Sequence, residues 1–280
     1  MAKLKDQVKG KSNDSNYISV QDYTGQGYEL PGGKANDKIA KAHKDEIDKA
    51  VKKFFLDKYK TEVKVHSIVG NKDGATVFVE SIGEPHFHTY VIVPIDAGNK
   101  KVLADEVWAQ EGAVEGAIES GLYQMINKSA FDNLDQYFKE LVSNYPVVGE
   151  TKKSIERTGA TGYMTPYYYI NIFDRKMDVV YNYYKDHPQA DATQLKSVFE
   201  NYNIDPEKIF ITIQLYMKDP EAQPSKKIFN TICDQIRNNK KLPKGLYRVV
   251  LHDNRIGKKS GSGNKDNSLI LHNKDKILIK

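Results

Sequence analysis

The sequence predicts a mixed α+β fold, in which a helix packs on an antiparallel three-strand meander and is followed by two helices. A second mixed α/β region, in which strands alternate with helices, is predicted after them. Three patterns support this fold: helical spacing of apolar residues between 39 and 55, three alternating runs between 61 and 95, and strict alternation from Ile209 to Met217. Of the 280 residues, 39% are hydrophobic and 28% are charged, which is typical of a globular protein.

The first unit begins with an amphipathic helix. Asn36 or Asp37 can accept the free amide protons at its start. Its apolar stripe consists of Ile39, His43, Ile47, Ala50, Val51, Phe54 and Phe55. Strands are predicted over 61–69, 75–82 and 86–95, and Asn71-Lys72-Asp73-Gly74 is a strong turn signal between the first two. The helix is therefore expected to lie across one face of this small sheet.

Two helices follow the meander. One carries an apolar stripe between residues 114 and 126, and the other carries a stripe between 131 and 142. Ser129 is expected to cap the second helix, and Tyr145-Pro146 ends it because proline cannot continue a helix.

Residues 147–162, which include Gly149, Gly159 and Gly162, form the best internal boundary of the chain. Before the first helix, the sequence is polar and rich in turn-forming residues, which predicts a flexible leader. The predicted parts are a leader at 1–35, an N-terminal α+β domain at 36–149 and a C-terminal mixed α/β domain at 150–280.

In the second region, strands and helices alternate. Asp191 and Gln194 form a capping-box pair before an apolar stripe, and Ser225 opens a helix that carries Cys233. The predicted strands are 167–173, 209–217, 246–252, 268–272 and 276–279, and the predicted helices start near 177, 192 and 225.

The positive charge of the chain is concentrated near its end. Residues 255–280 hold seven Lys or Arg residues against two Asp residues, while the formal net charge of the whole chain is +5. A basic stripe interleaved with aromatic side chains would indicate nucleic-acid binding, but here the charge lies in a Gly/Ser/Lys stretch. We therefore expect a solvated, mobile segment and no nucleic-acid partner.

His86 and His88 are the most site-like residues. Residues two apart on a strand point to the same face, so both imidazoles could approach one cation, with Glu84, His66 or Glu80 nearby. A metal site needs three or four ligands, and this pair supplies half of one. Because Phe87 and its neighbours form the better core face, we interpret both histidines as ordinary surface residues. The alternative is a metal-binding protein or enzyme centred on His86 and His88.

Other features favour structural roles. Cys233 lies among apolar residues at helical spacing, where a thiol is buried and inert. The tyrosines between 163 and 169 suit sheet packing, with a binding face as the alternative, and residues 257–263 lack the order of a phosphate-binding loop. Since no catalytic motif is recognisable, we assign no catalytic, cofactor-binding or metal residue and expect that the protein is not an enzyme.

Three segments carry a family resemblance: residues 25–33 (GQGYELPGG), 83–90 (GEPHFHTY) and 162–168 (GYMTPYY). In these, the chain resembles an uncharacterised family of Gram-positive, staphylococcal-type lipoproteins of unknown function, over nearly its whole length. The resemblance implies a protein tethered outside the cell membrane by a lipid anchor that this chain does not contain. It assigns no chemistry to any residue. The function expected from it is a non-catalytic envelope protein that presents a binding or structural surface.

Overall fold

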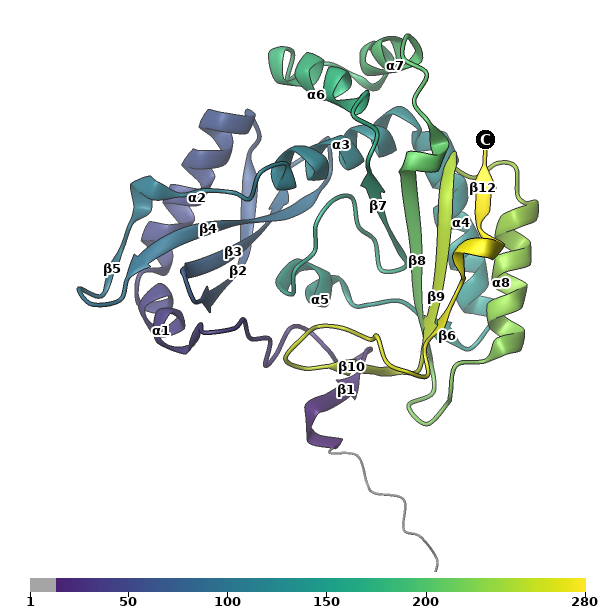
Figure 1. The fold of residues 1–280 in the computed structure, drawn as a ribbon, viewed down its shortest axis with the longest axis horizontal. Coiled ribbons are helices and arrows are strands. Elements are labelled where there is room, and N and C mark those ends of the chain that lie inside the picture. Colours follow the sequence, from purple (N-terminus) through teal and green to yellow (C-terminus); the bar gives the residue numbers. More distant parts are fainter. Residues whose placement is uncertain (1–13) are drawn as a thin grey trace, which may run out of the picture.

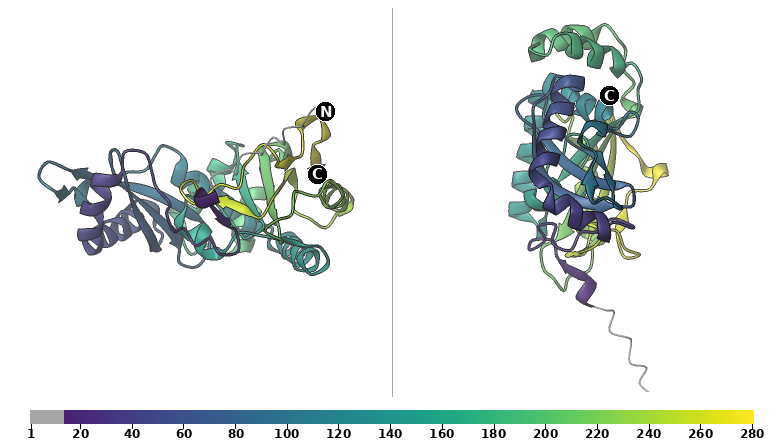
Figure 2. Two further views of the ribbon diagram at one scale, coloured as in Figure 1. Left: turned by 90° about the horizontal axis from the view of Figure 1, so that it is seen from below. Right: turned by 90° about the vertical axis from the view of Figure 1, so that its left-hand side faces the viewer.

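The computed structural model describes residues 14–280 and confirms the mixed α+β fold (Figure 1). A mostly antiparallel, helix-covered sheet stands at each end of the long axis of the molecule (Figure 2). Single turns of 3-10 helix lie at Asp14–Asn16, Ala104–Glu106, Pro206–Lys208 and Asn273–Asp275.

The first sheet has the strand order β2-β3-β4-β5 and is antiparallel. Its strands are Val63–Asn71, Gly74–Ser81, His88–Asp96 and Lys101–Val102. The predicted turn is confirmed, because β2 ends at Asn71 and β3 begins at Gly74. The predicted single helix is divided at His43 into α1 (Lys34–Ala42) and α2 (Lys44–Tyr59). Both helices pack on this sheet and bury their apolar stripes against it.

The helices α3 (Ala113–Ile126) and α4 (Lys128–Asn144) follow, as predicted. The N-cap of α4 is Asn127 and not Ser129. α3 contacts β4 of the first sheet and β7 of the second, so ten of its fourteen residues are buried.

The second sheet has the order β11-β9-β8-β6, with β12 also paired to β9 and β7 to β8. Its strands are β6 (Val147–Val148), β7 (Tyr168–Ile172), β8 (Ile209–Met217), β9 (Gly245–His252), β11 (Leu269–Ile270) and β12 (Ile277–Ile279). Helices α5 (Lys152–Arg157), α6 (Met177–Asp186), α7 (Ala192–Glu200) and α8 (Lys226–Asn238) lie between them in sequence. β8 and β9 are parallel, and α8 forms the connection that parallel strands need.

The predicted division at residue 150 crosses a shared core. α3 and α4 come before it in sequence but pack against β7 and β6, and buried side chains form one continuous cluster through both regions. Separate folding of 36–149 and 150–280 stays a prediction.

The N-terminal segment is packed, so the prediction of a flexible leader is wrong for its described part, residues 14–35. β1 (Tyr17–Ser19) pairs with β10 (Arg255–Gly257), and Val20 and Tyr23 are fully buried. The Tyr23 hydroxyl donates a hydrogen bond to the Lys258 carbonyl at 2.8 Å. Residues 1–13 of the predicted leader lie outside the described part of the chain.

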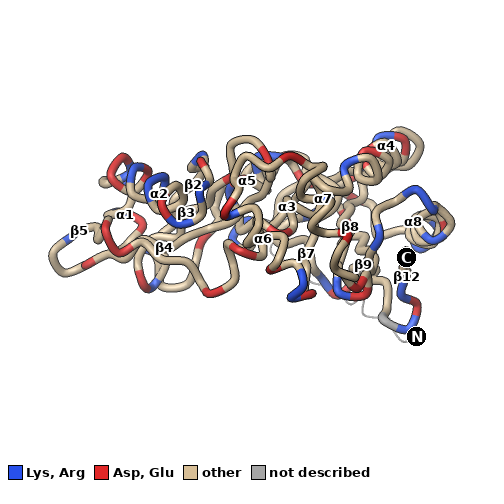
Figure 3. Tube along the Cα trace, turned by 90° about the horizontal axis from the view of Figure 1, so that it is seen from above, with Lys and Arg blue, Asp and Glu red and all other residues tan. Residues whose placement is uncertain are grey.

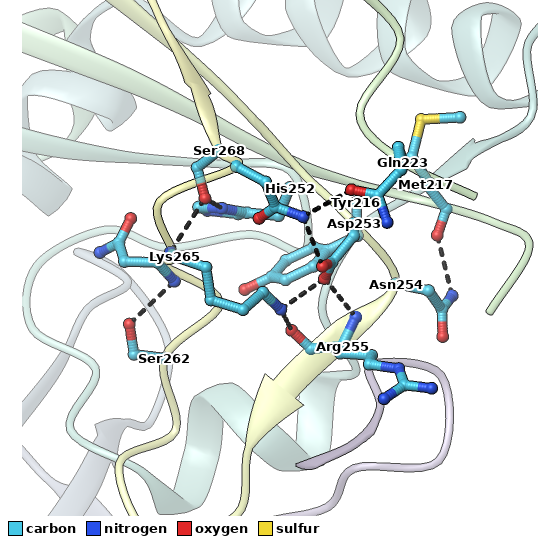
Figure 4. Close-up of polar contacts among 12 residues, drawn as sticks. Tyr216, Met217, Gln223, His252, Asp253, Asn254, Arg255, Ser262, Lys265 and Ser268 are labelled. Carbon is cyan, nitrogen blue, oxygen red and sulfur yellow. Dashed lines mark hydrogen bonds and ion pairs between the residues drawn. The ribbon is translucent and has the colours of Figure 1, made fainter. Parts of the chain in front are cut away.

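The basic stretch after residue 254 is likewise held in place and is not the solvated, mobile segment that its composition predicted. Lys265 pairs with Asp253 and also donates to the Arg255 carbonyl (Figure 4). The exposed fractions of the Lys265 and Asp253 side chains are only 17% and 11%. Over residues 14–280, no helix has both the length and the apolar character that a membrane span requires.

Candidate metal centre

Glu80 and His88 face each other across two paired strands. Glu80 lies near the end of β3 and His88 begins β4, and the antiparallel register makes them direct partners. Their side chains therefore share the outer face of the sheet, opposite the face that packs on α2. The backbone of His88 exchanges both hydrogen bonds with Gly162, at 2.9 and 2.8 Å, which fixes the start of β4.

His86 is brought to the same place by the connection between these strands. The Phe87 amide donates to the Ser81 hydroxyl at 2.9 Å, and the Ser81 hydroxyl donates to the Pro85 carbonyl at 3.0 Å. On the other side, Gly121 of α3 leaves room for the connection, since a Cβ there would lie 2.6 Å from the His86 carbonyl oxygen. Nε2 of His86 consequently lies 3.7 Å from Oε1 of Glu80.

A β-bulge adds His66. The pairing of β2 with β3 shifts register between Val65 and Ser67, so His66 is the extra residue. A bulge redirects the side chains around it, and here Nε2 of His66 lies 2.7 Å from Oε2 of Glu80. The apolar residues of β2 show this irregularity as well, because Val63 and Val65 are followed by Ile68 and not by an apolar residue at 67.

α5 covers this end of the sheet and contributes two charged residues that the sequence analysis missed. Oε2 of Glu156 lies 3.6 Å from Nδ1 of His66. Nζ of Lys152 lies 3.7 Å from Oε1 of Glu80 and 3.7 Å from Oε1 of Glu156. Thr151 accepts a hydrogen bond from the Ser154 amide at the start of this helix, a cap signal that could have identified α5.

Burial and the neighbouring groups together set the charges of Glu80 and His88. Burial alone would raise the pKa of Glu80, but the hydrogen bond to His66 and the neighbouring positive groups outweigh it and lower the pKa. His88 is only 3% exposed, and burial, followed by repulsion from His86, lowers its pKa to about 4. At neutral pH the cluster thus presents a carboxylate and a neutral imidazole, the protonation states that metal ligands need.

The distances distinguish ligands from supporting groups. Two ligands of a tetrahedral zinc ion, each about 2.1 Å from it, are about 3.4 Å apart. The 3.7 Å between Glu80 Oε1 and His86 Nε2 is close to that value. The 2.7 Å between Glu80 and His66 is too short for it and is a hydrogen-bond distance, so His66 orients the carboxylate.

Glu80, His86 and His88 each offer a ligand atom within 4.8 Å of the others. His88 also has a buried Nδ1 without a hydrogen-bond partner among residues 14–280. Buried polar atoms are almost always paired, so this histidine has unused bonding capacity. The donor set of two imidazoles and one carboxylate fits zinc and neighbouring transition metals.

The interpretation of His86 and His88 as ordinary surface histidines is therefore wrong for His88, which is buried, while His86 is half-buried. The strand pattern alone indicated an exposed face, because the segments that cover it, α5 and Gly162, come more than 60 residues later. Of the proposed neighbours, Glu80 joins as a ligand candidate and His66 as its partner. Glu84 is not among the groups that converge there, and its carboxylate accepts a hydrogen bond from the His86 backbone amide at 3.0 Å.

The remaining sequence-predicted features have structural roles. Cys233 is 5% exposed, so the predicted burial is confirmed, and burial raises the pKa of its thiol to about 11. Tyr168 is buried and its ring stacks on Phe138 and Phe131. Residues 258–263 form a loop after β10, which ends at Gly257. Along the tube of Figure 3, basic and acidic residues are interspersed.

A crystal structure of a DUF1672 family protein from Staphylococcus aureus has a similar fold, with a TM-score of 0.77 and 23% sequence identity. The similarity covers 91% of this chain and 97% of that chain. No curated protein matches the sequence. The model of a family described as proteins of unknown function, DUF1672, matches residues 10–280. The chain therefore belongs to the DUF1672 family, whose function is unknown.

Proposed function

We propose that the protein binds one transition-metal ion, zinc in the first instance, through Glu80, His86 and His88. The observation that carries this proposal is the convergence of these three groups within 4.8 Å. The orientation of Glu80 by His66 and the unpartnered Nδ1 of His88 support it. We further propose a binding role without catalysis, since the sequence carries no recognisable catalytic motif and the one cysteine has a raised pKa.

Metal analysis tests the binding proposal. The full chain, stripped with a chelator, is equilibrated with zinc and desalted, and the bound metal is measured by mass spectrometry. We expect about one zinc ion per chain, and loss of that ion in the double variant His86→Ala/His88→Ala. The double variant His187→Ala/His272→Ala, in which both replaced histidines are exposed, is the matched control and keeps the metal.

Because His88 is buried, its replacement can disturb folding. The single variant His86→Ala removes a half-buried ligand and serves as the second test, with circular dichroism to confirm that it is folded. Wild-type protein without zinc, or a folded His86→Ala/His88→Ala protein that retains it, would refute the proposal.

For location, we propose the extracytoplasmic face of the cell membrane, with attachment through a lipid anchor. The support is the resemblance of residues 25–33, 83–90 and 162–168 to a lipoprotein family. In the cells that make it, the protein is expected in the membrane fraction and should be labelled by a membrane-impermeant biotin reagent applied to intact cells. Recovery in the cytosolic fraction, unlabelled, would contradict this location.

A further inference from the structure

Lys152 lies on the solvent side of the metal cluster. It is the first residue of α5, and its side chain is 71% exposed, while those of Glu80 and Glu156 are 11% and 13% exposed. Its ammonium group is 3.7 Å from one oxygen of each carboxylate. In the metal-free protein, Lys152 thus supplies a positive charge between two largely buried negative ones.

The ammonium group shares an oxygen with the proposed metal. Oε1 of Glu80 lies 3.7 Å from Nζ of Lys152 and equally 3.7 Å from Nε2 of His86. An ion bound about 2.1 Å from Oε1 would lie no more than about 6 Å from the ammonium group, where a divalent cation and a unit charge repel each other appreciably even in water. The metal ion and the Lys152 ammonium group therefore compete for Oε1 of Glu80.

Glu156 offers the lysine a second position. It lies one helical turn after Lys152 on α5, the spacing at which a lysine and a glutamate are neighbours. The ammonium group of Lys152 is exposed, so water solvates it in either position and the move costs little. The ammonium group can therefore leave Glu80 and remain paired with Glu156.

We infer that Lys152 is a built-in competitor of the metal ion: it neutralises Glu80 in the empty site, and the incoming ion displaces it toward Glu156. This inference rests on the metal site proposed above. Its consequence is a site that is weaker than its ligands alone would make it and that depends on ionic strength. Such a site is suited to reversible loading rather than to permanent structural binding.

The test compares zinc affinities of the full-length wild type, Lys152→Gln and Lys153→Gln, measured by competition with a chromophoric chelator. Lys153 is an exposed neighbour on the same helix, so its variant matches the change in net charge. We expect Lys152→Gln to bind zinc roughly tenfold more tightly at low salt, because the repulsion is removed. Lys153→Gln should stay within about twofold of the wild type, because screening by water weakens a more distant charge. At high salt, the advantage of Lys152→Gln should shrink.

The outcomes separate the two proposals. Absence of zinc binding in all three proteins would refute the metal site and, with it, the role of Lys152. Zinc binding by the wild type with an equal or weaker affinity in Lys152→Gln would refute the competitor role alone. An equal gain in Lys153→Gln would also refute it, because the effect would then follow from net charge and not from the position of Lys152.

Discussion

Replacement of Lys265 by methionine is expected to destabilise the protein by about 3 to 5 kcal/mol, the cost typical of leaving a buried charge without its partner. Lys265 and Asp253 are both largely buried, and Lys265 also donates to the Arg255 carbonyl. Burial raises the pKa of Asp253, but hydrogen bonds from Asn267 and Lys265 outweigh it and lower the pKa, so the carboxylate is charged in the folded protein. Methionine is unbranched and only one heavy atom shorter than lysine, so it keeps the apolar stem and removes the ammonium group with its charge and hydrogen bonds.

Urea unfolding at pH 7 measures this effect. Lys259→Met is the control, because Lys259 forms an exposed ion pair with Glu29 and its loss should cost less than about 1 kcal/mol. The double variant Asp253→Asn/Lys265→Met should recover part of the stability, since it removes the unpaired charge as well. If Lys265→Met lowers the unfolding free energy by less than 1 kcal/mol, the ion pair between Lys265 and Asp253 does not stabilise the fold as predicted.

The second large effect concerns Glu119 on α3 and the dependence of stability on pH. Glu119 is 8% exposed, and its pKa is raised from 4.5 to about 8 by burial, by the charge of Asp178 and a hydrogen bond to it, and by the charge of Glu115. The folded protein therefore holds a proton that the unfolded chain releases near pH 4.5. The contribution of protonated Glu119 to the unfolding free energy is therefore fully present below pH 4.5 and is lost as the pH rises from 4.5 through 8.

Replacement of Glu119 by glutamine keeps the shape of the protonated acid and removes its titration. We expect Glu119→Gln to match the wild type near pH 5 and to exceed its unfolding free energy by about 4 kcal/mol at pH 9, because the pKa rises from 4.5 to about 8 and a change of one in a pKa corresponds to about 1.4 kcal/mol. Glu140→Gln, at an exposed position on α4, is the control and should leave the pH profile unchanged. Parallel pH profiles of wild type and Glu119→Gln would contradict the prediction.

The elements with strong local patterns were predictable. β8 follows the strict alternation from Ile209 to Met217, and α7 has the predicted capping box between Asp191 and Gln194. The short strands β1 and β10 were not predictable, because three-residue strands depend on a partner more than 230 residues away and carry no periodicity of their own. The same long-range pairing orders the polar N-terminal segment, whose composition indicated flexibility.

The candidate site was half predictable. The two-residue spacing of His86 and His88 predicted that both side chains lie on one face of a strand. The neighbouring predicted strands contain His66 and Glu80, which were named as further candidates. Burial of His88 could not be foreseen, because it depends on α5 and Gly162, which pack there only through tertiary structure. Lys152 and Glu156 lie in a segment whose glycines and threonines indicated a boundary, and this composition obscured a helix of six residues.

The bulge at His66 has a consequence for how this site can be gained or lost during evolution. His66 is the one residue of β2 that has no partner on β3 in the strand pairing. Deletion of this single codon would bring Val63, Val65 and the present Ile68 into regular alternation, so the hydrophobic side of the strand would survive unchanged. The carboxylate of Glu80 would lose its orienting imidazole in the same event. Homologues in which this strand is one residue shorter are therefore expected to keep the architecture and to bind the proposed metal ion more weakly, because they lack only the group that orients Glu80.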